Sequence, residues 1–277
     1  MFRQLILCGK IPVTTLDLVY RQGKNSNIAL NAKLMQQGRT DLIEGEDFQM
    51  IACKGAEEAA QIVKELYVKE LAVHGMDQVQ ILSPYKVRSA AGVIEINRTI
   101  QDLVNPPISG KKELHIHDHI FREGDKVLQN KNTEVASNGD MGILTEISED
   151  EDSNPLARIV FPDGRSVLYE ADQMDMVEHA NAITIHKSQG NECQVVIIPW
   201  VWAFYKMLKR NILYTGITRA KQKVYLVGEK KAITVAIKQE STGTRNTILA
   251  ERIRYYCDIY QKPTQRQPKM EQLRLAV

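Results

Sequence analysis

Residues 182–198 read AITIHKSQGNECQVVII, and residues 211–228 read NILYTGITRAKQKVYLVG. In each stretch a polar segment leads into a short run of apolar, mostly β-branched residues. Such a run, without polar alternation, is typical of a strand buried on both faces of a parallel sheet. Each stretch therefore predicts a helix that feeds a buried strand, and the two together indicate an α/β fold.

Polar side chains crowd the junctions before these strands. Arg219 ends the second predicted helix, just before its strand. The first junction is denser and holds Thr184, His186, Lys187, Ser188, Gln189 and Glu192. We expect these side chains to gather at one end of the sheet, where open parallel sheets bind ligands. An arginine held on rigid structure can stabilise the charge of a transferring phosphoryl group.

Helices and strands are also predicted on both sides of these two stretches. Helical periodicity, caps and breakers predict helices at 24–38, 56–74, 90–104, 182–190, 204–220 and 230–238. Short apolar runs predict strands at 79–85, 193–200 and 223–228. Asn25 or Ser26 would cap the first helix and Gly38 would end it, while Pro84 stops the first of these strands.

The pattern changes to a period of two between residues 113 and 178. Five or six short alternating segments are separated by turn signals, among them Asp163-Gly164 between two strands. An acidic run at 149–152 is most simply a solvated loop. These features predict a small antiparallel β-barrel inserted into the α/β domain.

Three histidines at alternate positions, His115, His117 and His119, suggest a metal site at first sight. On one straight strand their side chains would splay about 7 Å apart per step of two residues, whereas zinc needs ligands that converge. We therefore interpret them as a polar strand face and predict no metal site.

Composition limits the protein class. The 277 residues are 43% apolar and 25% charged, with a net charge of +2 and four widely spaced cysteines. No apolar run approaches the roughly 18 residues of a membrane helix. We expect a cytoplasmic protein with reduced thiols and no membrane partner. From residue 205 onward 16 Lys and Arg face 5 Asp and Glu, against 20 and 29 before it. This excess fits a polyanionic partner, but from charge alone solvated helix faces are the simpler explanation.

At this point a family resemblance emerges. T-I-H-K-S-Q-G-N-E (184–192) resembles motif V of superfamily 1 helicases, and L-Y-T-G-I-T-R-A-K (213–221) resembles their motif VI. Within the first of these segments, the sequence Lys-Ser-Gln-Gly is similar to the form of this motif in the RecD-like branch, the exodeoxyribonuclease V alpha-chain family. V-Y-R-Q (19–22) resembles the arginine-bearing motif IV. Further resemblances follow in order: I-L-S-P-Y-K (81–86), F-R-E-G-D-K-V-L-Q-N (121–130) and N-G-D-M-G (138–142).

The departure from that family is equally informative. A helicase motor needs a phosphate-binding loop, G-x-x-x-x-G-K-[ST], and the sequence contains no such string. The resemblance therefore implies a second motor domain. We expect the first in a preceding part of the protein; the alternative is a degenerate gene that has lost it. We expect a RecA-like domain, a P-loop NTPase fold lacking the P-loop, at 1–112 and 179–260. The barrel would occupy 113–178 and a loose tail 261–277.

The resemblance also implies roles. Arg219 and Arg21 would be catalytic, reaching the γ-phosphate of ATP, and Gly190, Glu192 and Gln22 would lie at the nucleotide. Ordinary surface roles are the alternative for each. The side chains implied at single-stranded DNA are Thr184, His186, Lys187, Ser83, Pro84, Tyr85 and Lys86.

The parent would be an ATP-dependent DNA helicase that translocates on single-stranded DNA and unwinds it in recombination or repair. ATP and Mg²⁺ would be bound mainly by the missing N-terminal motor domain, so this chain alone should be inactive. The alternative is a non-catalytic module that binds nucleic acid or another protein.

Overall fold

The computed structural model describes residues 2–14, 26–87, 89–239 and 247–260. They form two compact units, one of residues 2–14 with 247–260 and the other of residues 26–87 with 89–239. The first unit pairs helix α1 (Phe2–Leu7) with α7 (Leu249–Tyr260). The Lys10 ammonium lies 2.6 Å from the Asp258 carboxylate, and Arg254 donates to the Cys8 carbonyl. The predicted bounds of the RecA-like domain, 1–112 and 179–260, include both helices.

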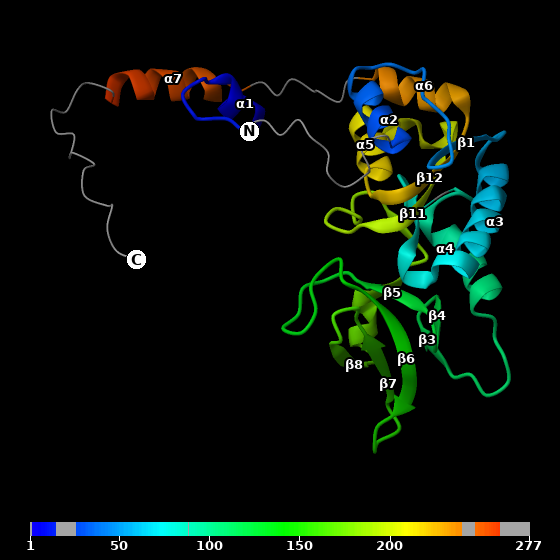
Figure 1. Ribbon diagram of the computed structural model, residues 1–277. Coiled ribbons are helices and arrows are strands. Elements are labelled where there is room, and N and C mark those ends of the chain that lie inside the picture. The colour runs from blue at the N-terminus through cyan, green and yellow to red at the C-terminus, as the bar shows by residue number, and fades with distance from the viewer. Residues whose placement is uncertain (1, 15–25, 88, 240–246, 261–277) are drawn as a thin grey trace, which may run out of the picture. The chain divides into compact units, whose positions relative to one another are not determined.

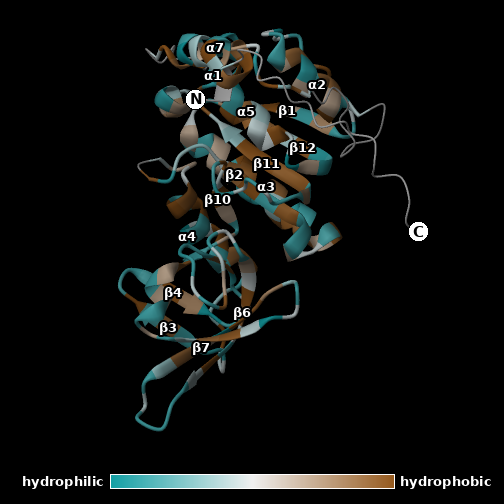
Figure 2. Ribbon diagram, turned by 90° about the vertical axis from the view of Figure 1, so that its left-hand side faces the viewer, coloured by the Kyte–Doolittle hydropathy of each residue, from teal (hydrophilic) through white to brown (hydrophobic). Residues whose placement is uncertain are grey.

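A five-stranded parallel sheet forms the centre of the larger unit (Figure 1). Its strands, in spatial order, are β1 (Phe48–Ala52), β12 (Ala220–Gly228), β11 (Cys193–Trp200), β2 (Val79–Ser83) and β10 (Ala182–Thr184). The strand interiors are strongly hydrophobic (Figure 2). Val195 through Ile198 are fully buried, and because alternate side chains point to opposite faces, both faces must be covered.

Two groups of helices cover the sheet. The first comprises α3 (Ala56–His74) and α4 (Val93–Val104), and the second α2 (Asn27–Gln36), α5 (Arg210–Ile217) and α6 (Lys230–Lys238). Ser26 caps α2 by accepting from the Ile28 amide, as its side-chain chemistry predicts. Gly38 follows with φ +75°. The α/β, RecA-like fold class is confirmed.

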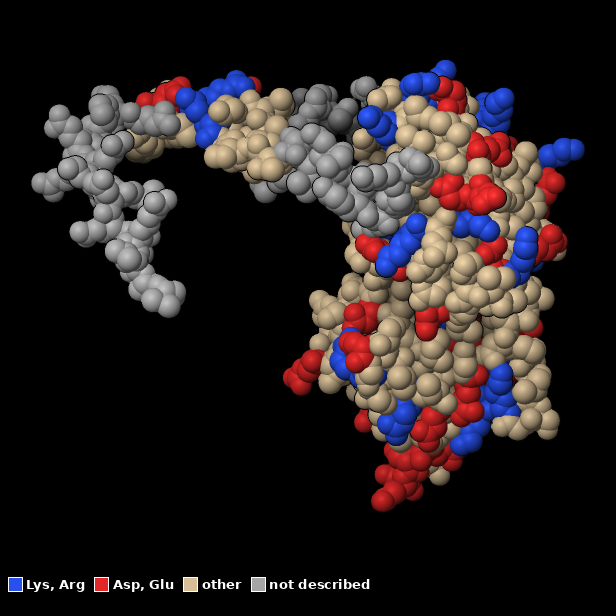
Figure 3. Space-filling view, viewed as in Figure 1, with Lys and Arg blue, Asp and Glu red and all other residues tan. Residues whose placement is uncertain are grey.

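The middle of the sequence, from residue 126 to 179, holds an antiparallel sheet with its own hydrophobic core. It joins β8 (Ser166–Glu170), β7 (Pro155–Val160), β6 (Met141–Glu149), β5 (Lys126–Gln129) and β9 (Val177–His179) in that order. Figure 3 shows acidic side chains gathered at the far tip, where the 149–152 run links β6 to β7. Asp150 accepts from the Asp152 and Asn154 amides and so holds that turn.

Two predicted helices differ from the structure. Residues 182–190 were predicted to be helical, but 182–184 form β10 and turns follow. The β-branched Ile183, Thr184 and Ile185 favour an extended chain. The predicted 204–220 helix divides into the 3₁₀ segment η3 (Trp202–Met207) and α5, and β12 already begins at Ala220.

The histidine segment is a hairpin rather than one strand. β3 (Glu113–Ile116) pairs with β4 (His119–Arg122), and His117 sits in the turn with φ +50°. The three histidines therefore do not share one strand face. Elsewhere in the described residues the remaining short elements are 3₁₀ turns, η1 (Met76–Gln78) and η2 (Gln173–Met176). No helix among the described residues is long and apolar enough to cross a membrane.

Candidate functional site

The predicted site residues lie at two opposite edges of the parallel sheet. At the carboxyl edge, where β2 and β10 end, Ser83 pairs with Thr184. At the amino edge, where β11 and β12 begin, Cys193 pairs with Ala220. Glu192 and Arg219 directly precede these two residues and therefore lie at the same edge. The expectation of one common end was therefore wrong, because the 185–192 segment runs back along the sheet between the two edges.

The amino edge holds the arginine predicted to be catalytic. Arg219 is half-buried and its Nε donates to the Thr215 carbonyl at the end of α5, 3.2 Å away. Its own carbonyl accepts from the Cys193 amide at 3.2 Å. The Glu192 carboxylate lies 3.2 Å from the Lys221 ammonium. The arginine thus stands on a rigid junction between a helix and a central strand, next to a carboxylate–ammonium pair.

Gly190, Arg21 and Gln22 are the other residues predicted to act at the nucleotide. Gly190 has φ +96°, and a Cβ there would meet no atom within 4 Å, so backbone conformation rather than space requires glycine. Arg21 and Gln22 lie outside the described residues.

At the carboxyl edge, the loop after β2 is built around a buried hydroxyl. Ser83 donates to the Ala91 carbonyl at 2.9 Å and accepts from the Tyr85 amide. Ser83 and Pro84 are both buried, so they shape the loop and offer no contact surface of their own. Tyr85 is half-buried and stacks on Phe204, with ring centroids 5.7 Å apart. Tyr85 and Lys86 are thus the accessible members of the predicted loop.

A carboxylate from β9 joins the two predicted DNA-binding lysines. Glu178 lies 2.6 Å from the Lys86 ammonium and 2.9 Å from that of Lys187. Lys187 also donates to the Asn130 side chain. Burial alone would raise the pKa of Glu178, but the hydrogen bonds from both lysines hold it below its ordinary value. The sequence analysis missed Glu178, because its partners lie 92 and 9 residues away.

The remaining two predicted DNA contacts are Thr184, the last residue of β10, and His186 just after it. Thr184 is half-buried, and its hydroxyl accepts from the Lys187 amide at 3.3 Å. His186 is exposed and lines an open polar groove. The other lining residues are Asn138, Gly139, Asp140, Lys187, Gln189 and Asn191. The motif V segment therefore faces the loop between β5 and β6, which the sequence analysis did not connect to it.

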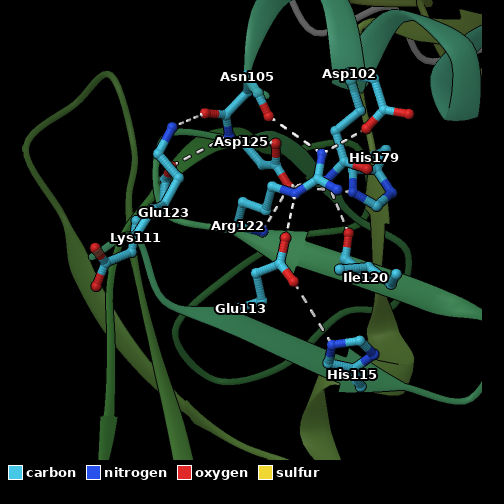
Figure 4. A network of polar contacts seen from close by, with 11 residues as sticks. Asp102, Asn105, Lys111, Glu113, His115, Ile120, Arg122, Glu123, Asp125 and His179 are labelled. Carbon is cyan, nitrogen blue, oxygen red and sulfur yellow. Dashed lines mark hydrogen bonds and ion pairs between the residues drawn. The ribbon is translucent and has the colours of Figure 1, made fainter. Parts of the chain in front are cut away.

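A buried polar network joins α4 to the antiparallel part (Figure 4). Its centre is the Asp125 carboxylate, which is 2% exposed and accepts from Gln101 at 2.6 Å and Asn105 at 2.7 Å. The Arg122 amide and the His179 ring complete its contacts, at 2.7 Å and 3.2 Å. Arg122 itself bridges Glu113 and Asp102. Because His179 directly follows Glu178, β9 connects this network to the lysine pair.

Among the described residues, no group of three or more His, Cys, Asp or Glu converges as metal ligands would. The side chains described at the two edges include an arginine and two lysines, which offer fixed positive charge. An arginine backed by a helix end can stabilise phosphoryl charge, and a pair of lysines can hold phosphate oxygens.

Two family models match the chain. A UvrD-like helicase C-terminal domain matches residues 179–227, which run from β9 to β12 and carry both predicted motifs. The SH3 domain of ATP-dependent RecD-like DNA helicases matches residues 96–161, from α4 through β7. The first match includes Thr184, Glu192 and Arg219 but not the Ser83–Lys86 loop, and the second includes Asp125 and its partners other than His179.

Known proteins agree with these matches. The ATP-dependent RecD2 DNA helicase of Deinococcus radiodurans is 28% identical over 90% of this chain, which spans 33% of that relative. The RecBCD enzyme subunit RecD of Mycolicibacterium smegmatis is 32% identical over 42% of the chain, which spans 19% of that relative. This chain thus spans a third or less of their lengths.

The fold has a counterpart among solved structures. A Bacteroides Pif1 helicase in complex with ADP-AlF3 and ssDNA superimposes with a TM-score of 0.52 at 17% identity, over 88% of this chain and 57% of that one. At that identity the likeness concerns the fold alone. Sequence motifs and family matches together show that the chain is similar to the C-terminal part of RecD-like superfamily 1 DNA helicases, the part that carries the UvrD-like C-terminal domain and the SH3 domain.

Proposed function

We propose that this chain is the second motor half of an ATP-dependent helicase that translocates on single-stranded DNA and unwinds duplex DNA in recombination or repair. It would work with the N-terminal motor domain of the same protein, which would bind most of the ATP and its Mg²⁺. One observation carries the proposal. Arg219 lies at one edge of the parallel sheet, and Lys86 and Lys187 lie at the opposite edge. The sheet would therefore connect the arginine that binds the phosphate of ATP to the residues that bind DNA.

At the amino edge the proposed task is charge neutralisation. Arg219 would reach the γ-phosphate of ATP held by the partner domain and stabilise the charge that develops during hydrolysis. Its anchoring at the end of α5 limits the motion of its side chain. Glu192 is proposed to lie at the nucleotide together with Gly190, whose turn presents backbone amides. Arg21 and Gln22, which resemble motif IV and lie outside the described residues, are proposed to act on the nucleotide as well.

At the carboxyl edge the proposed task is to hold a DNA strand. Lys86 and Lys187 would bind phosphate oxygens, and Thr184 and His186 would contribute hydrogen bonds. Tyr85 packs on Phe204 and gives the loop a fixed position. With Ser83 and Pro84 buried, we propose that they act only through the shape of the loop.

The DNA proposal is tested by binding of single-stranded oligonucleotides to the 277-residue chain over a salt series. Affinity should fall as salt rises, because lysine–phosphate contacts release counterions. Lys86→Ala and Lys187→Ala should each weaken binding and reduce the salt slope by about 0.7. Lys69→Ala, an exposed lysine on α3, is the matched control. Salt-independent binding, or equal effects of all three variants, would contradict the proposed DNA edge.

The Lys86–Glu178–Lys187 bridge gives a second prediction. Glu178 is ionised in the folded protein and holds both ammonium groups as a phosphate would, so it competes with DNA. Glu178→Gln should therefore tighten single-strand binding about threefold or more at low salt and steepen the salt dependence. Glu170→Gln on β8 makes the same charge change at an exposed position and should change little. Weaker binding by Glu178→Gln would mean that the carboxylate orients the lysines rather than competing for them.

A further inference from the structure

Two aromatic side chains stand exposed directly after β11. Trp202 is 41% exposed and Tyr205 is 60% exposed, both in η3. Every other Trp, Tyr and Phe in the described parts of 26–239 is buried or half-buried. Single exposed apolar residues are ordinary on protein surfaces. Trp202 and Tyr205 differ from such single residues, because two large exposed rings lie within four residues of each other while the other described aromatic side chains of this unit are buried or half-buried.

A lysine ammonium group lies over each of these two rings. The Lys231 nitrogen lies 4.5 Å from the centre of the Trp202 ring, and the Lys206 nitrogen lies 5.9 Å from that of Tyr205. An apolar protein surface docking on the rings would have to remove water from both lysines, which is unfavourable. A partner with flat aromatic groups on an anionic backbone would use rings and lysines together.

The position of η3 points to the same kind of partner. β11 lies beside β2 and runs parallel to it, so η3 leaves the sheet at the carboxyl edge, as the Ser83–Lys86 loop does. The stack of Tyr85 on Phe204 fixes that loop against the residue preceding Tyr205. The backbone of η3 is held as well, because the Trp202 amide donates to the Glu229 carboxylate at 2.6 Å. Preordered rings lose little entropy on stacking.

We propose that Trp202 and Tyr205 form a base-stacking platform for unpaired nucleobases of the strand whose phosphates Lys86 and Lys187 hold. This inference rests on the proposed DNA-binding function and adds contacts to the bases. It assigns no sequence preference, since every base offers a flat face.

The test separates bases from phosphates. The 277-residue chain is titrated with oligothymidylate and with an abasic deoxyribose-phosphate strand of equal length. Oligothymidylate should bind about tenfold more tightly, and Tyr205→Ala should remove about tenfold from that affinity alone. Tyr205→Phe keeps the ring and should retain binding. Tyr255→Ala makes the same truncation at an exposed position on α7 and should leave both affinities unchanged.

Intrinsic fluorescence gives an independent readout. The chain has two tryptophans, of which Trp200 is fully buried and Trp202 is exposed. Oligothymidylate should quench the Trp202 emission, the abasic strand should not, and Trp202→Phe should remove the quenched component. Equal affinity for both strands, or equal loss for both in Tyr205→Ala, would overturn the platform while leaving the phosphate contacts intact. Failure to bind either strand would overturn the DNA function itself, and the platform with it.

Discussion

Replacing Arg219 by alanine should lower kcat for DNA-stimulated ATP hydrolysis about a thousandfold in a protein that joins this chain to its N-terminal motor domain. An arginine that stabilises the transferring phosphoryl group contributes on the order of 10³ to 10⁵ in kcat. The effect should appear mainly in kcat, because the charge that Arg219 neutralises develops in the transition state. Steady-state ATP hydrolysis with saturating single-stranded DNA measures it.

Three comparisons make this result specific. Arg219→Lys keeps the charge but not the planar geometry of the guanidinium and should remain strongly impaired. Arg158→Ala removes a half-buried arginine that pairs with Glu146 on the antiparallel sheet and should leave kcat unchanged. Single-strand binding by Arg219→Ala should also be unchanged, because the lysine pair occupies the opposite sheet edge. The isolated 277-residue chain should hydrolyse no ATP. Normal hydrolysis by Arg219→Ala would refute the role proposed for this residue.

The sequence correctly predicted the helices and strands that local apolar patterns determine. The apolar run at 193–200 forms β11 over that same range, and the 56–74 periodicity forms α3. The short strand before Pro84 is β2. In each case burial of an uninterrupted apolar pattern, or of one helix face, outweighs every competing arrangement. The order of these elements was enough to bring Glu192 and Arg219 together.

The errors arose where distant residues decide the local structure. β10 is stabilised by the Asn97 side chain, which donates to the Ala182 carbonyl and accepts from the Ala182 amide, 85 positions away. The turn at His117 is set by pairing with β4 rather than by the alternation of histidines. Glu178 gained its place between Lys86 and Lys187 from the docking of β9. A single sequence contains no local signal for such contacts.

The network around Asp125 is the largest of these non-local features, and Asp125→Ala should lower the free energy of unfolding by about 3–5 kcal/mol. The substitution would leave buried donors from Gln101, Asn105, the Arg122 amide and His179 without their common acceptor. Urea unfolding at pH 7, followed by circular dichroism, measures the loss. Asp163→Ala removes an exposed carboxylate that pairs with Arg165 and should cost about 1 kcal/mol or less. An equal cost for the two variants would show that the network does not stabilise the fold.

The same carboxylate should make stability depend on pH in the acid range. Burial alone would raise the pKa of Asp125, but hydrogen bonds from His179, Asn105 and the Arg122 amide hold it below its ordinary value. A carboxyl group whose pKa is lower in the folded state stabilises the protein fully above its unfolded pKa, about 3.9, and less as pH falls through the folded value. The free energy of unfolding should therefore drop below about pH 4, and it should drop less in Asp125→Asn, which has no proton to gain at this site. Because the acceptor joins α4 to the strand that carries Glu178, the acid-induced loss in the native chain should also release the Lys86–Glu178–Lys187 bridge. A matching pH profile for native chain and Asp125→Asn would assign the acid sensitivity to other carboxylates.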